Sequence, residues 1–387
     1  MSETYIFFTS QFYPHVGGVE RNTVNLAKRL KEDGHRVIII TNTPDDGNDN
    51  SHGFEVLRIP SFSVAGDRLR FYIPGSTLRK VLSYIEKIKN ARVIVQTMLY
   101  QMSLLGVKIA EKKSWPCIVI THGSNFVCPG KSPVDLAEQI YEKTMAKLIK
   151  SHCPNIYSVS VAAADYLKVL KVPNAGVLYN SIDHSQIKKY YDSSDNDILN
   201  GINVSDDSFV LCYIGRLIKE KGIGELVGAV KRLCDEGYNI ELIVAGNGPM
   251  FNVLNDSHEK IHFIGEVSQE KVVNILKYSD AFILPSYSEG LPTSVMEAMV
   301  CKCYCVVSPY GGTKELIPDN RFGFLMDGCT EKDVYTALKY VYNDSISTLS
   351  PRENSYKRFF EYFTWERTVE KLYSAFENAV IRSKENV

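Results

Sequence analysis

The sequence has no long apolar run. None approaches the ~18 consecutive residues that a membrane-spanning helix needs, and the start, Met1-Ser2-Glu3-Thr4, lacks the basic and apolar segments of a secretory signal peptide. No signature of an RNA- or DNA-binding module is present, so we expect no nucleic-acid partner. The dinucleotide fingerprint GxGxxG is also missing, because Gly222 and Gly224 are followed by Gly228 one position too late. A nicotinamide-dependent dehydrogenase is therefore disfavoured.

Cysteine is too sparse for a disulfide framework, with nine residues in a chain of 387. Cys117 and Cys212 lie in apolar, strand-like runs, where a free thiol behaves as a small hydrophobic group. Cys301, Cys303 and Cys305 alternate and would share one face of an extended segment, but no fourth ligand with matching spacing follows. We therefore interpret them as core residues and expect a reducing, cytoplasmic location.

Charge is divided unevenly along the chain. Residues 1–175 hold 22 Lys and Arg against 15 Asp and Glu, whereas the remainder holds 22 against 30. A basic first half predicts an anionic partner, for which a membrane surface is the favoured candidate.

The length predicts two domains, and both halves alternate strands with helices. The polar segment 188–208 is expected to be an exposed connection. We therefore predict an α/β protein with two Rossmann-like domains over 1–185 and 186–364, whose parallel sheets face each other across a ligand-binding cleft. The last helix, about 365–387, is a candidate to dock back on the first domain.

Two glutamates flank a predicted helix start. Glu289 follows the apolar strand 281–284, and Glu297 lies about one turn into a helix that begins at Pro292 or Thr293. A helix N-terminus attracts anions, while carboxylates accept hydrogen bonds from hydroxyl groups. The pattern predicts a ligand with a phosphate in the middle and a hydroxylated ring at each end.

Other strand ends carry cations, glycines or a histidine. Arg216 and Lys221 follow the strand 209–214 and suit a diphosphate. Gly17 and Gly18 precede a helix, and glycines there let the backbone approach a ligand closely. His122 ends a strand of the first half, where it would open into the cleft.

Taken together, these segments resemble a retaining glycosyltransferase with the GT-B fold, specifically glycosyltransferase family four. The matching segments run in order over nearly the whole chain: Gly17-Gly18-Val19-Glu20, Thr121-His122-Gly123, Asn180-Ser181-Ile182-Asp183, Gly215-Arg216 with Lys221-Gly222, Gly246-Asn247-Gly248-Pro249, Glu289 to Glu297, and Gly311-Gly312-Thr313-Lys314-Glu315. Ser181 stands where glycine is more usual in this family.

The resemblance implies a role for each matching residue. It assigns the donor diphosphate to Gly17, Gly18, Arg216 and Lys221, the donor sugar to Glu289, the ribose to Glu297, and the transferring sugar to His122. Among these, His122, Arg216, Lys221 and Glu289 are the candidate catalytic residues. The donor-binding set also includes Gly246 and the helix start at Leu291, Pro292 and Thr293.

The implied reaction moves a sugar from a nucleotide-diphosphate sugar, with a UDP-sugar expected, to a saccharide or lipid-diphosphate-linked acceptor. Bacterial surface-polysaccharide assembly is the expected setting. The cations would stabilise the leaving diphosphate, so no metal or other cofactor is expected. Two alternatives remain open: a GT-B sugar-nucleotide epimerase or phosphorylase, and a non-catalytic nucleotide-sugar-binding protein.

A segment in the first half mixes cations with aromatic side chains. We expect a loop over 67–74 and assign the acceptor or membrane side of the protein to Arg68, Arg70, Phe71 and Tyr72. The alternative is a solvated loop with an aromatic ring tucked into the core. Peripheral attachment to an anionic inner membrane face would follow from the first interpretation.

Overall fold

The chain forms two compact units in a computed structural model. The structure describes residues 2–14, 17–44, 52–64, 69–123, 133–193, 201–202, 204–205, 207–255, 257–344 and 349–385. Unit 1 comprises 1–180 together with 365–387, and unit 2 comprises 181–364. The expected boundary, between residues 185 and 186, lies five residues after this division.

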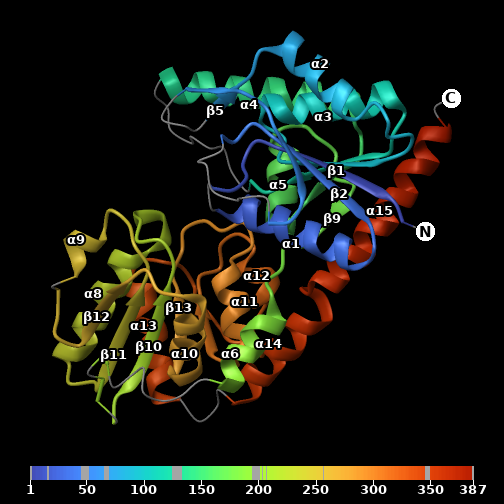
Figure 1. Ribbon diagram of the computed structural model, residues 1–387. Helices are drawn as coiled ribbons and strands as arrows, with labels where there is room; N and C mark the ends of the chain where they lie inside the picture. The colour runs from blue at the N-terminus through green and yellow to red at the C-terminus, as the bar shows by residue number, and fades with distance from the viewer. Residues whose placement is uncertain are drawn as a thin grey trace. The chain divides into compact units, whose positions relative to one another are not determined.

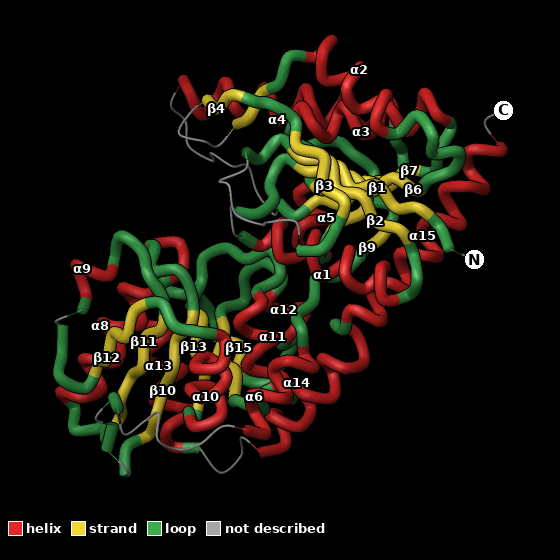
Figure 2. The backbone as a smooth tube through the Cα atoms, viewed as in Figure 1, coloured by secondary structure: helices red, strands yellow, loops and turns green. Residues whose placement is uncertain are grey.

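Unit 1 contains a seven-stranded parallel sheet (Figures 1 and 2). Its strands, in the order β3-β2-β1-β6-β7-β8-β9, are Glu55–Arg58, Arg36–Thr41, Thr4–Thr9, Arg92–Gln96, Cys117–Thr121, Ile156–Ser158 and Gly176–Val177. The central strands are rich in β-branched and aromatic residues because both faces of a parallel sheet are covered by helices.

Two apolar cores cover the two faces of this sheet. Alternate strand residues such as Ile6 and Phe8 belong to one core, and Tyr5 and Phe7 to the other. The first core includes residues of α2 (Pro74–Tyr84), α3 (Gln101–Lys113) and α4 (Pro133–His152). The second includes residues of α1 (Gly18–Glu32), α5 (Val161–Val169) and α15 (Trp365–Glu385). The buried Phe376 of α15 shows that the end of the chain completes this core.

The segment expected as a loop over 67–74 is partly a strand. Leu69–Phe71 forms β5, which pairs antiparallel with β4 (Phe62–Val64). Tyr72 is buried, its hydroxyl donates to the Gln101 carbonyl oxygen, and its backbone N–H donates to the Gln101 side chain. Tyr72 therefore cannot belong to a surface contact as long as this packing persists. Arg68 lies outside the described residues.

Unit 2 contains a six-stranded parallel sheet. Its strands, in the order β12-β11-β10-β13-β14-β15, are Ile261–Gly265, Ile240–Ala245, Phe209–Ile214, Ala281–Leu284, Tyr304–Val307 and Phe324–Leu325. Cys212, Cys303 and Cys305 are buried, which agrees with their interpretation as core residues. Cys301 caps a helix instead of extending the strand, so the three thiols do not lie along one extended segment.

The helices of unit 2 are distributed over its sheet (Figure 1). They are α6 (His184–Ser193), α8 (Ile223–Asp235), α9 (Phe251–Leu254), α10 (Gln269–Tyr278), α11 (Thr293–Val300), α12 (Thr313–Leu316), α13 (Glu331–Asn343) and α14 (Leu349–Tyr362), with a short 3-10 turn at Lys219–Lys221. Helix α8 packs against α13, and α11 packs against α6 and α14. The expectation of an exposed connection over 188–208 is wrong for its first residues. Residues 188–193 belong to helix α6, in which Ile187 is buried.

Candidate functional site

The strand order of unit 2 defines where a ligand would bind. Strand β10 pairs with β11 on one side and with β13 on the other, so the chain runs in opposite directions across the sheet from β10. The loops after β10 and β13 then diverge at the carboxyl edge, which is the usual ligand position in open α/β sheets. The loop after β10 carries Arg216 and Lys221, and the loop after β13 carries Glu289.

Lys221 and Glu289 form an ion pair across this point. The Lys221 Nζ lies 2.6 Å from Glu289 Oε1, and the two side chains are 19% and 7% exposed. A pair so little exposed needs further hydrogen-bonding partners to offset its desolvation. Sequence analysis assigned the two residues to different parts of one ligand, and the structure places them in direct contact.

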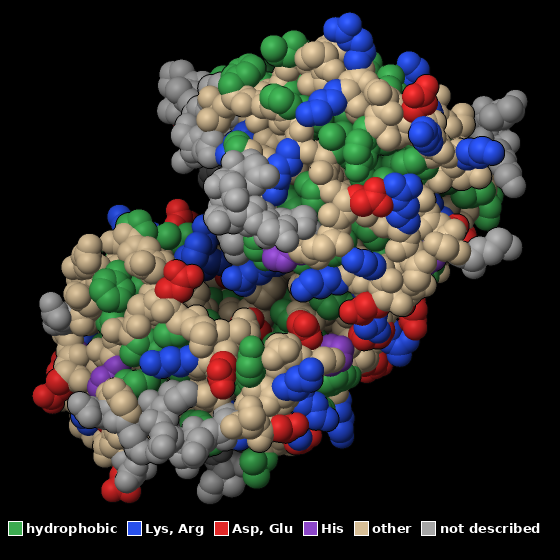
Figure 3. All heavy atoms as spheres, in the orientation of Figure 1, with side chains coloured by type: hydrophobic (Ala, Val, Ile, Leu, Met, Phe, Trp, Pro, Cys, Tyr) green, Lys and Arg blue, Asp and Glu red, His purple; other side chains and the backbone are tan. Residues whose placement is uncertain are grey.

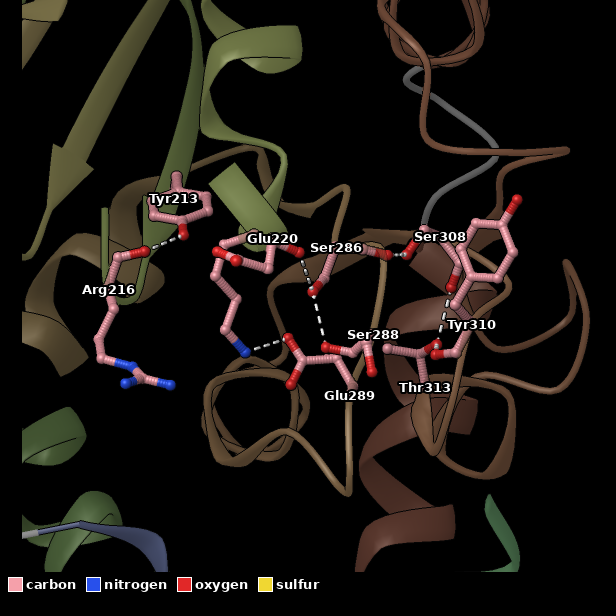
Figure 4. A network of polar contacts seen from close by, with 10 residues as sticks. Tyr213, Arg216, Glu220, Ser286, Ser288, Glu289, Ser308, Tyr310 and Thr313 are labelled. Atoms are coloured by element: carbon pink, nitrogen blue, oxygen red, sulfur yellow. Dashed lines mark hydrogen bonds and ion pairs between the residues drawn. The ribbon is translucent and has the colours of Figure 1, made fainter. Parts of the chain in front are cut away.

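Arg216 lies on the same loop with its side chain extended. Its carbonyl oxygen accepts a hydrogen bond of 2.9 Å from the Tyr213 hydroxyl, while its guanidinium makes no hydrogen bond or ion pair with the residues that the structure describes (Figure 4). Burial raises the pKa of Tyr213, which therefore remains a donor at any physiological pH. Tyr213 thus fixes the Arg216 backbone and leaves its exposed guanidinium available to a ligand.

Serine and threonine hydroxyls connect the loops around Glu289 (Figure 4). Ser286 donates to the carbonyl oxygens of Glu220 and Ser288, both at 3.1 Å, and so joins the loop after β10 to the loop after β13. Ser308, after β14, donates to the Ser286 carbonyl oxygen at 2.5 Å. These bonds hold the Lys221–Glu289 pair on three neighbouring strand ends rather than on one free loop.

Two glycines are required where these loops meet. Gly246 has φ of +139°, and a Cβ there would lie 1.9 Å from the Gly215 carbonyl oxygen, next to Arg216. Gly311 has φ of +63°, and a Cβ there would lie 2.0 Å from the Glu289 carbonyl oxygen. No larger residue fits either position without moving a loop of the site.

Helix α11 begins directly after the Glu289 loop. Pro292 is its N-cap residue and makes no side-chain cap bond, so the first backbone N–H groups from Thr293 onward offer donors and a positive dipole end. Leu291 is buried and anchors the helix start. Glu297 lies one turn into the helix, as predicted, and its Oε1 accepts a hydrogen bond of 3.0 Å from Gln269 Nε2.

In unit 1, the predicted glycine pair precedes helix α1. Gly17 is the N-cap of α1, and Gly18 is its first residue. The buried Glu20 turns back toward this start, with Oε2 only 2.7 Å from the position that a Gly17 Cβ would occupy. A carboxylate near a helix N-terminus is favourable. The Glu20 carboxyl group therefore lies next to the backbone of the Gly17-Gly18 pair.

His122 directly follows β7 and contacts a buried amide. Its Nε2 lies 2.6 Å from Oε1 of Gln96, the last residue of β6. Burial lowers the pKa of His122 to about 4, so the imidazole is neutral at pH 7. Gln96 in turn donates to Asn22 of α1 at 3.0 Å.

The predicted residues fall into two groups. Unit 2 brings together Arg216, Lys221, Glu289, Gly246, Leu291, Pro292, Thr293 and Glu297 at the carboxyl edge of its sheet. Unit 1 contains Gly17, Gly18 and His122, and also Arg70, Phe71 and Tyr72. The last three lie on or beside the β4–β5 hairpin, where the Phe71 ring contacts Tyr141 of α4.

Several residues that support the site were not predicted from the sequence. Gln96 could have been identified, because it is a polar residue at the end of an apolar strand. His122 was identified from the same pattern. Gln269 and Asn22 had no such signal because their partners are distant in the chain, and Tyr213 had none because it lies within the apolar strand β10.

Among the residues that the structure describes, no three or more His, Cys, Asp or Glu side chains cluster in a way that could hold a metal ion. Metal independence nevertheless stays a prediction. No helix in the same part of the chain combines the length and apolar character needed to cross a bilayer.

Two family models match consecutive parts of the chain. The model described as glycosyltransferase family 4 matches residues 16–186, and the model described as glycosyl transferases group 1 matches residues 180–358. The second range contains the Arg216, Lys221 and Glu289 loops, and the first contains the Gly17-Gly18 pair and His122.

Curated relatives match at moderate identity over much of their length. An uncharacterized glycosyltransferase of Methanocaldococcus jannaschii is 27% identical, with 97% of this chain and 98% of the relative aligned. The GPI3 subunit of phosphatidylinositol N-acetylglucosaminyltransferase from Saccharomyces cerevisiae is 23% identical, over 80% of this chain and 68% of its own.

A solved structure confirms the predicted fold. The Anabaena protein HepE in complex with UDP superimposes with a TM-score of 0.75 at 16% identity, covering 98% of this chain and 100% of its own. The same protein has been solved with UDP-glucose. With the parallel sheets of the two units, this likeness establishes the GT-B fold.

Proposed function

We propose that the chain is a glycosyltransferase that transfers a sugar from a nucleotide-diphosphate sugar with retention of the anomeric configuration, because its fold is GT-B and glycosyltransferase family models match residues 16–186 and 180–358. One observation carries the proposal: Arg216, the Lys221–Glu289 ion pair and the N-terminus of α11 lie at the switch point of the unit 2 sheet. UDP-sugars are the donors to test first, since the Anabaena protein binds UDP and UDP-glucose.

The donor is placed by the charges of unit 2. Arg216 and the α11 N-terminus bind the diphosphate, and Glu297 accepts hydrogen bonds from the ribose. Glu289 accepts hydrogen bonds from the donor sugar while its other contact, Lys221, orients the carboxylate. In unit 1, Gly17 and Gly18 contact the diphosphate, and His122 contacts the transferring sugar.

The chemical step needs charge stabilisation at the leaving group. As the bond between the sugar and the diphosphate breaks, negative charge grows on the phosphate oxygens and the sugar becomes oxocarbenium-like. Glu289 holds the Lys221 side chain, Tyr213 holds the Arg216 backbone, and the α11 dipole belongs to the fold, so stabilisation of the leaving group requires little reorganisation. In this mechanism, protein cations neutralise the diphosphate and no metal is needed.

The acceptor hydroxyl attacks on the same face that the diphosphate leaves. A leaving phosphate oxygen then takes the proton of the attacking hydroxyl, which accounts for retention without a protein nucleophile. Glu289 is held by Lys221 and therefore is not cast as that nucleophile.

The acceptor is proposed to be a saccharide or a lipid-linked saccharide, in surface-polysaccharide assembly. A lipid-linked acceptor is supported by a surface of unit 1 that exposes large apolar side chains. Phe62 of β4 and Ile73 beside α2 are 58% and 68% exposed, and Leu136 and Ile140 of α4 are 49% and 66% exposed. Soluble proteins rarely expose such groups together without a partner.

Basic side chains continue this apolar surface along α4. One face of α4 carries exposed residues spaced three or four positions apart, namely Leu136, Ile140, Lys143 and Lys147. The ring contacts Phe62–Phe71 and Phe71–Tyr141 tie the hairpin to α4. Figure 3 shows Lys and Arg side chains spread over the visible face of unit 1. We propose that this surface contacts an anionic membrane at the cytoplasmic face.

A panel assay tests the transfer reaction. Each nucleotide sugar is incubated with the protein, with and without lipid-diphosphate saccharides, and release of nucleoside diphosphate is measured. We expect release that depends on the acceptor, persists in EDTA and gives a product with the donor's anomeric configuration by NMR. Conversion of the donor without an acceptor would instead indicate an epimerase.

Vesicle binding tests the membrane contact. The protein should bind phosphatidylglycerol vesicles at low salt and be released at high salt, because surface charge attraction is screened. Ile140→Ser and Lys147→Glu should each weaken binding, whereas Ile381→Ser, at an exposed position of α15, should not. Equal binding by all of them would rule out α4 as the contact.

A further inference from the structure

Three buried amide side chains of unit 1 form a continuous series of hydrogen bonds that ends at the partly buried His122. His122 Nε2 lies 2.6 Å from Gln96 Oε1, Gln96 Nε2 donates to Asn22 Oδ1 at 3.0 Å, and Asn22 Nδ2 donates to Asn180 Oδ1 at 3.0 Å. Gln96 is fully buried, and Asn22 and Asn180 are nearly so. Buried amides without partners are costly, so each bond constrains the next one.

The direction of these bonds fixes the proton on His122. Each amide has one acceptor oxygen and one donor NH₂ group. The Gln96 NH₂ group is used by Asn22, so the Gln96 oxygen is the atom that faces the imidazole. An oxygen acceptor needs a donor opposite it, and His122 Nε2 must therefore carry the hydrogen. In the neutral ring, Nδ1 is then the nitrogen with the lone pair.

We propose that Gln96 and Asn22 are positioning residues that hold His122 in its Nε2-protonated tautomer, so that Nδ1 accepts a hydrogen bond from a hydroxyl of the sugar substrate. The inference rests on the proposed glycosyl transfer and assigns the kind of contact that His122 makes there. The series of hydrogen bonds extends from Asn22 to Asn180, which is the last residue of unit 1 before the polypeptide enters unit 2.

The ionisation of His122 separates this role from general-base catalysis. Burial is the cause that lowers its pKa to about 4. At pH 7 only about one ring in a thousand is then protonated, and such a weak base gains little from taking a proton at neutral pH. A neutral acceptor fits a hydroxyl donor and would not neutralise a phosphate.

Nitrogen NMR on the intact, ligand-free protein tests the tautomer directly. The His122 signals are assigned by comparison with His122→Gln. We expect a protonated Nε2 and an unprotonated Nδ1 that persist from pH 8 down to about pH 5. A protonated Nδ1, or a mixture of both tautomers, would overturn the proposal whether or not a substrate pair has been found.

Two substitutions at Gln96 separate positioning from structural support. Gln96→Leu removes the acceptor, so we expect mixed tautomers and about tenfold lower kcat/KM, which corresponds to one lost hydrogen bond. Gln96→Glu keeps an acceptor opposite Nε2 but adds a negative charge that raises the pKa of His122. That variant should keep the tautomer and remain active at high pH. As the pH is lowered, its activity should begin to fall at a higher pH than that of the parent.

A matched control lies beside the first residue of β7, the strand that His122 follows. Asn155 is also a buried amide, and its Nδ2 donates to the Cys117 carbonyl oxygen at 3.3 Å, where β7 begins. Asn155→Leu should lower stability without changing the His122 tautomer or the pH profile of turnover.

The proposal fails if Gln96→Leu changes the tautomer but keeps full turnover, or if Gln96→Glu leaves the pH profile unmoved. Absence of transfer by the parent protein would refute the proposed function, while the tautomer would still decide the positioning role.

Discussion

The two units present opposite kinds of chemistry at the carboxyl edges of their sheets. Unit 2 presents formal charge, in the Lys221–Glu289 pair and the exposed Arg216. Unit 1 presents neutral groups, in His122 and the Gln96 amide that binds it. Charge suits the diphosphate of a donor, and neutral acceptors suit sugar hydroxyls.

This contrast runs against the net charge of the two halves. Residues 1–175 carry an excess of basic groups, and the rest of the chain carries an excess of acidic groups. At the ends of β6 and β7, unit 1 presents the neutral Gln96 and His122, although the unit as a whole carries more basic than acidic residues. Net charge therefore indicates what approaches a unit, whereas a few fixed side chains decide what its site can bind.

The strongest test of the charged site removes one partner of the ion pair. Lys221→Met should destabilise unit 2 by about 3–5 kcal/mol, because Glu289 would remain buried and unpaired. Adding Glu289→Gln to that variant should restore most of the stability but not the turnover. Thermal unfolding and the panel assay measure the two effects.

A surface ion pair of the same length is the control. Lys302 Nζ lies 2.6 Å from Glu353 Oε1, but both side chains are at least 40% exposed. Lys302→Met should cost less than about 1 kcal/mol. Equal losses at Lys221 and Lys302 would contradict the importance of burial for the Lys221–Glu289 pair.

Removal of the second cation should affect turnover more than folding. Arg216→Ala should raise the barrier by about 2–4 kcal/mol, by analogy with the loss of one anion-stabilising donor. Stability should hardly change, since the guanidinium bonds to no side chain in the described part of unit 2. Arg321→Ala, which removes an exposed arginine paired with Asp319, should leave turnover intact. Full turnover in Arg216→Ala would defeat the assignment.

The neutral site of unit 1 makes a prediction about pH. The folded-state pKa of His122 is about 4 and its ordinary value is about 6.5, so folding favours the neutral ring. The resulting stability is fully present above about pH 6.5 and is lost as the pH falls toward 4, by up to about 3 kcal/mol. Unfolding free energies measured from pH 7 to pH 4 should therefore fall less steeply in His122→Gln.

A buried amide of the same unit serves as the control for this measurement, because an amide does not titrate. Asn155 donates a hydrogen bond to the Cys117 carbonyl oxygen. Asn155→Leu should lower the unfolding free energy by the same amount across this pH range and so retain the parent slope. If His122→Gln and the parent lose stability in parallel, burial does not govern the ionisation of His122.

The smallest expected effect concerns the backbone that supports Arg216. Gly246→Ala would place a Cβ 1.9 Å from the Gly215 carbonyl oxygen at a φ of +139°, so the loop must shift. We expect a loss of about 1–3 kcal/mol of stability and weaker donor binding, measured by calorimetry. Gly224→Ala is the control, because it lies in α8 with open space around its Cβ position. Equal behaviour of the two variants would show that the Gly246 contact is unimportant.

Much of the fold was predictable because its signals are local. Apolar runs such as 281–284 and 209–214 form strands as expected, and α11 begins at Thr293. Polar residues that directly follow such strands lie at the carboxyl edge of a parallel sheet by geometry alone. Arg216 could therefore be identified from its position in the chain.

Predictions failed where a segment's own composition was overruled by its neighbours. The segment 188–208 is polar, yet its first residues continue α6 because Ile187 is buried and α6 packs against α10. Tyr72 stands beside charged residues and still belongs to the core, since α3 supplies a partner for its hydroxyl. Packing against distant elements outweighs local propensity in both cases.

The amino-acid sequence by itself determined the alternation of strands and helices and the identity of the residues at the strand ends, because both follow from short-range patterns. Only the tertiary structure decided which of those residues touch. Lys221 meets Glu289 across 68 positions of the chain, and Gln96 meets Asn22 across 74. Such pairs depend on strand order and on the close approach of backbones at Gly246 and Gly311, which no local pattern encodes.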